Sequence, residues 1–339
     1  MSTQTEPTGA GHADGVTELS YRDSVNAALF DEMSADAAVY FMGEDVGAAG
    51  GVFKTNEGLA EAFPGRVINT PICENGFVGA ALGMAVTGLR PVVEIMFSDF
   101  LPSAADAIVN EVSKFRYMSG GQCEVPLTIR SIGGGTGRFG TQHSATGESW
   151  FLQQPGLYVC SAGTPGAAYE VLRAAIGNRN PVLFFEHKGL YGRSGPVRRG
   201  SVADFGKAEI VREGTDLTIL STLLMTERSL AAARSLAEEG VDVEVIDMRW
   251  LRPLDLETVR TSLDKTGLLL IAEEQVHTAS WGASVISRLT MEGRQWAYPP
   301  RAVGLSEDLL IPYSPPLEDE SIPSVERIAA RARELVSRR

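Results

Sequence analysis

Short apolar runs alternate with amphipathic stretches through the first half of the chain. The apolar runs have the length and composition of buried parallel strands. Between them, apolar residues recur at spacings of three and four, which predicts helices. A strand, helix, strand rhythm predicts a parallel sheet covered on both faces. The predicted strands span residues 38–42, 91–96, 126–132, 157–161 and 181–186, and the predicted helices span 21–35, 75–88, 99–117 and 164–177.

The rhythm stops at residues 191–206, which are rich in glycine and arginine and have no apolar period. We interpret this segment as an interdomain linker. The alternation then resumes to the end of the chain, so the sequence predicts an α/β fold with two tandem domains, each containing a parallel sheet, at 20–190 and 207–339. The later predicted strands span 217–221, 243–247 and 268–272, and the helices span 226–239, 255–263, 281–291 and 324–336.

Length and charge narrow the functional classes. A chain of 339 residues suits two domains of ordinary size. The 43 acidic residues outnumber the 30 Lys and Arg, and the net charge of −13 disfavours nucleic acid as the main partner. No apolar run reaches 18 residues, so no membrane span is predicted.

The first nineteen residues and the cysteines indicate the compartment. Residues 1–19 are polar and lack Lys and Arg, which predicts a short disordered tail rather than a targeting peptide. The cysteines Cys73, Cys123 and Cys160 form no C-x-x-C pair, so neither a disulfide framework nor a zinc site is indicated. We expect a cytoplasmic, reducing location.

A glycine-rich loop follows the strand predicted at 126–132. Gly135, Gly137 and Gly140 match G-x-G-x-x-G, but no helix opens there and no acidic residue ends the next strand, which argues against a dinucleotide site. The loop leads to His143. Because loops at the carboxyl ends of parallel strands carry ligand contacts, His143 is a candidate proton donor or oxyanion partner, the alternative being a surface histidine.

Glu74 lies between a predicted strand and a helix start, among small and apolar neighbours. A carboxyl group in an apolar crevice has a raised pKa and can share a proton at neutral pH. Such a group suits a cofactor whose heterocyclic nitrogen must be held by an acid. The alternative is a glutamate that only interacts with the helix dipole.

Taken together, several motifs resemble one family, the beta subunits of thiamine-diphosphate-dependent 2-oxo acid dehydrogenase decarboxylase components. This group of the transketolase-like superfamily includes pyruvate, branched-chain and acetoin enzymes. The resemblance runs from about residue 20 to the end and implies a pyrimidine-binding domain at 20–190 and a transketolase-type C-terminal domain at 207–339. It rests on GEDVG at 43–47, GGVFK at 50–54, RVINTPICE at 66–74, GLRP at 88–91, YMSGG at 117–121, QHS at 142–144, RWLRPLD at 249–255 and residues 312–318.

The resemblance assigns roles to three residues. Glu74 matches the glutamate that hydrogen-bonds nitrogen N1′ of the aminopyrimidine ring of thiamine diphosphate. Phe100 matches an aromatic residue that packs on this ring, the alternative being an ordinary core phenylalanine. His143 matches a histidine that faces the reacting centre and the lipoyl group.

Some members of this family also hold a potassium ion. Asn178 stands where the mammalian pyruvate enzyme has an aspartate, and the loss of that charge weakens a cation site. The matching positions are Leu127, Ala175, Ile176, Asn178 and Asn180.

The chain contains no G-D-G motif followed by N-N, which thiamine diphosphate enzymes use to hold the diphosphate and magnesium. The resemblance implies that an alpha subunit supplies this half in an α2β2 heterotetramer, and that the complex docks on a lipoyl acyltransferase core. We expect the glycine-rich helix at 76–88 to pack against another subunit, the alternative being tight packing inside its own domain.

The resulting functional prediction is oxidative decarboxylation of a small 2-oxo acid with acyl transfer to lipoamide. The alternatives are cleavage of acetoin, one half of a split transketolase, and a non-catalytic assembly subunit. Arg138 and Phe139 lie close to His143 in the sequence, and we expect them to contribute to substrate selectivity.

Overall fold

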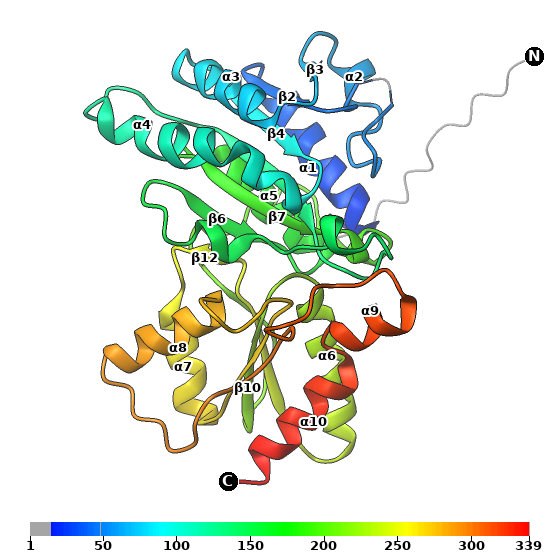
Figure 1. The fold of residues 1–339 in the computed structure, drawn as a ribbon, viewed down its shortest axis with the longest axis vertical. Helices are drawn as coiled ribbons and strands as arrows, with labels where there is room; N and C mark the ends of the chain where they lie inside the picture. Colours follow the sequence, from blue (N-terminus) through cyan, green and yellow to red (C-terminus); the bar gives the residue numbers. More distant parts are fainter. Residues whose placement is uncertain (1–14, 48, 339) are drawn as a thin grey trace, which may run out of the picture.

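The computed structural model describes residues 15–47 and 49–338. Figure 1 shows two α/β lobes along the long axis, the first half of the chain forming one and the second half most of the other. The two-lobed α/β architecture is as predicted. Within the described residues, no helix is both long enough and apolar enough to cross a bilayer.

The first lobe is built on a seven-stranded sheet in the order β12-β6-β7-β5-β4-β2-β3. Every pairing within it is parallel except that of β12, which runs antiparallel to β6 at the edge. Because β12 comes from the second half of the chain, the two lobes share this sheet. The strands are β2 (Val39–Gly43), β3 (Val67–Asn69), β4 (Arg90–Ile95), β5 (Thr128–Gly133), β6 (Tyr158–Ser161), β7 (Val182–His187) and β12 (Trp250–Arg252).

Helices cover both faces of this sheet. Side chains alternate across a strand, so Phe184 packs in the cluster of α1 and α5, whereas its neighbour Phe185 packs in the cluster of α3. The helix predicted at 99–117 is divided into 3-10, π and α segments, with Pro102, which lacks an N–H, in the first. The elements are α1 (Tyr21–Ala35), α2 (Leu59–Ala62), α3 (Glu74–Val86), η1 (Ser98–Ala104), η2 (Ala107–Val112), α4 (Ser113–Met118), η3 (Thr141–His143), η4 (Glu148–Phe151), α5 (Pro165–Gly177) and η5 (Lys188–Leu190).

The second lobe has a five-stranded sheet in the order β14-β13-β10-β11-β9, parallel apart from β9. Helices α6 and α10 pack together, and Figure 1 shows α7 and α8 on the opposite side of the lobe. The elements are β9 (Glu209–Arg212), β10 (Leu217–Ser221), α6 (Leu223–Glu238), β11 (Val243–Asp247), α7 (Leu256–Thr266), β13 (Leu269–Ala272), α8 (Trp281–Met291), β14 (Arg301–Val303), α9 (Pro315–Ser321) and α10 (Val325–Val336).

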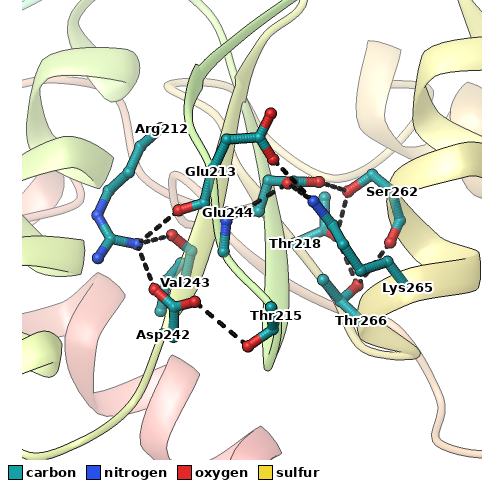
Figure 2. A network of polar contacts seen from close by, with 11 residues as sticks. Arg212, Glu213, Thr215, Thr218, Asp242, Val243, Glu244, Ser262, Lys265 and Thr266 are labelled. Carbon is teal, nitrogen blue, oxygen red and sulfur yellow. Dashed lines mark hydrogen bonds and ion pairs between the residues drawn. The ribbon is translucent and has the colours of Figure 1, made fainter.

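A polar network joins α7 to β10 and β11 in this lobe (Figure 2). The fully buried Glu244 accepts hydrogen bonds from Ser262 and Lys265. The hydroxyl of Thr218 lies 2.6 Å from that of Ser262 and 2.7 Å from that of Thr266. The network thus gives hydrogen-bond partners to the Glu244 carboxylate, whose burial without partners would cost free energy.

The predicted tail and linker differ from the structure. Residues 16–20 form β1 (Val16–Ser20), which pairs antiparallel with β8 (Ser194–Arg198), a strand inside the segment predicted as a linker. Both strands are short and partly exposed, so neither has an apolar run that would predict it. The rest of the predicted tail, residues 1–14, lies outside the described residues.

Candidate active site

An aromatic cluster forms at the carboxyl end of the first sheet. The His143 ring meets Phe97 edge to face, with centroids 4.7 Å apart, and Phe100 in the same manner at 5.5 Å. Phe139 lies 5.9 Å from Phe97. His143 and Phe100 are both half-buried, so each keeps part of its surface accessible. Two of the three residues that the family resemblance implied are thus brought together by η1 and η3.

The glycine-rich loop before His143 has an unusual backbone. Gly134, Thr136, Arg138 and Gly140 all have positive φ. A side chain at Gly134 would collide with the imidazole of His187, and one at Gly140 would collide with the Tyr313 ring. Two non-glycine residues in this conformation are strained, so the surrounding contacts must hold the loop in place.

Carboxylates of the second lobe supply those contacts. Glu274, in the loop after β13, accepts a hydrogen bond from the Gly135 amide at 2.6 Å and lies 3.0 Å from His187 Nε2. The Gly189 amide donates to His187 Nδ1, which leaves the proton on Nε2, facing Glu274. Burial acts to raise the pKa of Glu274, but His187 and the Gly135 amide outweigh it, so this pKa is lowered.

The Arg138 side chain also turns toward the second lobe. Its guanidinium pairs with the buried Glu318 and with Asp319, and it donates to the Pro315 carbonyl at 3.0 Å. Arg138 is therefore engaged with α9. Phe139, its neighbour, lies in the aromatic cluster instead.

Glu74 begins α3, as expected, but its predicted apolar crevice is absent in the described chain. The side chain is half-exposed, because the first turn of α3 lies at an open face where Ile72 and Gly76 are also exposed. The nearby carboxylate of Glu44 is buried, and its Oε1 atom has no hydrogen-bond partner among the described residues. Burial first, and then the charge of Glu74, raise the pKa of Glu44.

A buried ionic group, which the sequence did not reveal, lies on three neighbouring strands of the first sheet. Arg130 on β5 donates to Glu94 on β4 at 2.7 Å and to Glu186 on β7 at 2.6 Å. Tyr191 donates to Glu186 at 2.9 Å. The available signal was a charged residue inside each of three apolar strands. Burial raises the pKa of Glu94, although Arg130 opposes this effect.

The positions matched to the potassium site do not fit that ion. The Arg90 guanidinium donates to the carbonyls of Ile176, at 2.5 Å, and Asn178, at 3.5 Å. The Leu127 carbonyl accepts from the Val182 amide, and the Ala175 carbonyl accepts from the Asn178 amide. The side chain of Asn180 accepts from Arg116. Because the Arg90 guanidinium already binds the carbonyls of Ile176 and Asn178, its positive charge would repel a potassium ion at these positions.

Comparisons with known proteins agree over both lobes. Residues 17–194 match the family described as transketolase, pyrimidine binding domain, and residues 206–328 match transketolase, C-terminal domain. The fold is similar to a solved split-gene transketolase described as an inactive beta4 tetramer, with a TM-score of 0.78 and 22% identity, covering 94% of this chain and 98% of that one.

Three curated relatives are similar over nearly the whole chain. The beta subunit of acetoin:2,6-dichlorophenolindophenol oxidoreductase from Cupriavidus necator is 40% identical, covering 93% of this chain and 97% of its own. The pyruvate dehydrogenase E1 component subunit beta-1 of Arabidopsis thaliana is 39% identical, covering 94% and 89%. The corresponding Rhizobium meliloti subunit is 38% identical, covering 91% and 68%. The chain therefore belongs to the transketolase-like family, in the group of the pyruvate dehydrogenase E1 and acetoin oxidoreductase beta subunits.

Proposed function

We propose that this protein is the beta subunit of a thiamine-diphosphate-dependent decarboxylase component that acts on a small 2-oxo acid and passes the acyl group to lipoamide. The observation that carries the proposal is the edge-to-face pair of His143 and Phe100 in a chain about 40% identical to such subunits. Glu74 lies on α3, the helix that packs against the η1 segment carrying Phe100.

The residues present suit the cofactor. Thiamine diphosphate, when bound, supplies a carbon nucleophile and an electron sink. A protonated Glu74 would donate a hydrogen bond to ring nitrogen N1′, and the accessible face of Phe100 would pack on the aminopyrimidine. The Oε1 atom of Glu44, which lies near Glu74, has no hydrogen-bond partner among the described residues. This atom could therefore bind a proton or accept a hydrogen bond at the site. His143 would donate a proton at the reacting centre.

We further propose that an alpha subunit completes the site in an α2β2 assembly and holds the magnesium and the diphosphate. The half-exposed Glu74 supports this, because a carboxyl group that must share a proton needs an apolar cover, which the described residues of the single chain do not provide. The exposed small residues Gly76, Gly79, Ala80 and Gly83 on α3 mark the surface where that cover would lie. Docking on a lipoyl acyltransferase core follows from the same assignment.

A second candidate is cleavage of acetoin. The 40% identity to the acetoin oxidoreductase beta subunit extends over 97% of that protein, which is as strong as the likeness to the pyruvate enzymes. The two reactions share the same groups on this chain, since both need an acid at N1′ and a proton donor near the reacting carbon.

Co-expression with an alpha-type subunit separates these functions. The purified complex, with thiamine diphosphate and magnesium, is assayed by reduction of 2,6-dichlorophenolindophenol on pyruvate, branched-chain 2-oxo acids and acetoin. Turnover that requires the cofactor and is lost in His143→Ala is the expected result. Turnover on acetoin alone assigns the second candidate, and an assembled complex without turnover on any substrate would contradict both.

A further inference from the structure

Lys188 links the two ends of the glycine-rich loop. It follows β7 and begins η5, and its ammonium donates to the Gly134 carbonyl at the start of the loop. The same ammonium donates to the His143 carbonyl, at 2.7 Å, where the loop ends. Because an ammonium carries three donors, one side chain can close a loop whose backbone is held partly in strained conformations.

The same ammonium also contacts the aromatic wall around the His143 ring. It lies 5.4 Å from the Phe139 centroid and 5.9 Å from that of Phe97, which are cation–π distances. Phe97 is in turn the closest ring partner of His143, at 4.7 Å. Lys188 therefore contacts both the backbone of His143 and the rings against which its imidazole packs.

Burial of this ammonium costs free energy, because it removes the charge from water. Burial lowers the pKa of Lys188 to about 8, although Glu274, Asp99 and Glu318 oppose this effect. The group is thus mostly charged at neutral pH. Removing the lysine alone would leave the carbonyls of Gly134 and His143 without this donor, so the ammonium holds these two carbonyls at the cost of its own desolvation.

We propose that Lys188 is a positioning residue for His143. It fixes both ends of the glycine-rich loop and the aromatic wall, so that the imidazole is presented to the reacting centre. The catalytic part of this inference rests on the proposed function. The structural part, that Lys188 holds residues 134–144 in place, does not.

The first test compares Lys188→Met with wild type in the complex of this chain with its alpha subunit, thiamine diphosphate and magnesium. We expect kcat to fall by about 10- to 100-fold, since small misplacements of catalytic groups cost about this much, and KM to stay within about threefold. The double variant with His143→Ala should be no slower than His143→Ala alone, because both changes remove one function. Lys207→Met, at an exposed lysine paired with Glu257, is the matched control and should retain wild-type kcat.

The second test needs no turnover. Hydrogen exchange of the peptide covering 134–144 should be several-fold faster in Lys188→Met than in wild type, whereas exchange of the peptide covering β10 should be unchanged. If Lys188→Met does not fold, Lys188→Gln, which retains a donor, replaces it, with smaller changes in the same direction. Unchanged hydrogen exchange in the peptide covering 134–144 overturns the inference. A double variant whose kcat is lower than that of His143→Ala by the full factor seen for Lys188→Met alone overturns it as well. If the wild-type complex acts on no 2-oxo acid or acetoin, the proposed function fails, while the exchange result still decides whether Lys188 holds the loop.

Discussion

The two candidate catalytic residues, His143 and Glu74, differ in how firmly the chain holds and covers their side chains. The chain itself fixes His143, through the rings of Phe97 and Phe100 and through the Lys188 bond to its carbonyl. Glu74 stands half-exposed at the start of α3. A carboxyl group reaches the poorly solvated state that proton sharing requires only when something covers it. At the residue scale, this chain therefore fixes the candidate residue His143 and leaves the candidate residue Glu74 open to solvent.

The change Glu74→Gln removes the acidic proton but keeps the shape of the side chain. An amide cannot share a proton with N1′, so we expect turnover of the complex to fall by roughly 10²- to 10⁴-fold, the range of general acid–base effects. The Tm should stay near the wild-type value, because the side chain is half-exposed and its helix is otherwise unchanged. Near-normal turnover in the dye-reduction assay would contradict the assigned role.

The sequence indicated the candidate residues His143 and Phe100 but not the residues that support them. His143 and Phe100 came from motif matches. Glu274 and Lys188 did not, because their importance depends on loops that meet only after the two lobes pack together. The enclosure expected around Glu74 was wrong for the single chain, since residue types around a carboxylate do not reveal whether its helix end faces the core or an open surface.

At the scale of elements, local capping explains where prediction was accurate. Helix α8 begins at Trp281 as predicted, because the Ser280 side chain accepts a hydrogen bond from the Ala283 amide. Ser20 caps α1 in the same way, through the Asp23 amide. In contrast, β12 is three residues long and directly precedes a proline, so no apolar period could predict it or its place in the first sheet.

The buried network of the second lobe allows a matched pair of threonine variants. The Thr218 hydroxyl bridges those of Ser262 and Thr266, so Thr218→Val leaves buried polar groups short of a partner (Figure 2). We expect the free energy of unfolding to fall by about 1–2 kcal/mol. Thr215→Val, at an exposed threonine before the same strand, should change it by less than about 0.5 kcal/mol. Urea unfolding measures both, and equal effects would rule out the buried bridge as the cause.

At the scale of the whole molecule, the two lobes are joined by buried polar contacts rather than by a loose linker. Gln275, after β13, donates to Glu148 at 2.5 Å, and the Thr146 hydroxyl donates to the Glu274 carbonyl at 2.7 Å. Strand β12 adds a shared sheet edge. The loop with His143 lies at this junction, so the site depends on both lobes being docked.

The junction should make stability depend on pH. Burial raises the pKa of Glu148 from 4.5 to about 7. Because the folded pKa is above the unfolded one, the stabilising contribution is complete below about pH 4.5 and is lost as pH rises through about 7. Glu148→Gln stays neutral, so from pH 5 to pH 8 the wild type should lose on the order of 3 kcal/mol relative to it. Urea unfolding at both pH values measures this, with Glu61→Gln as the exposed control, and a gap that does not change with pH would contradict the assignment.

The exposed face of α3 carries the last prediction, which concerns assembly. A glycine inside a helix costs about 1 kcal/mol relative to alanine, yet a Cβ atom added at Gly79 or Gly83 would meet no described atom within 4 Å apart from its chain neighbours and the backbone of its own helix. Packing within this chain therefore does not require these glycines, whereas close approach by another backbone would. Gly83→Leu should leave the Tm of the isolated chain unchanged or higher and weaken its assembly with the alpha subunit at least tenfold in Kd, because the side chain would stand between the two surfaces. Gly177→Leu, at an exposed glycine that ends α5, should leave assembly unchanged in sedimentation analysis. If both leucine variants form the heterotetramer equally well, α3 is not the surface that the alpha subunit covers.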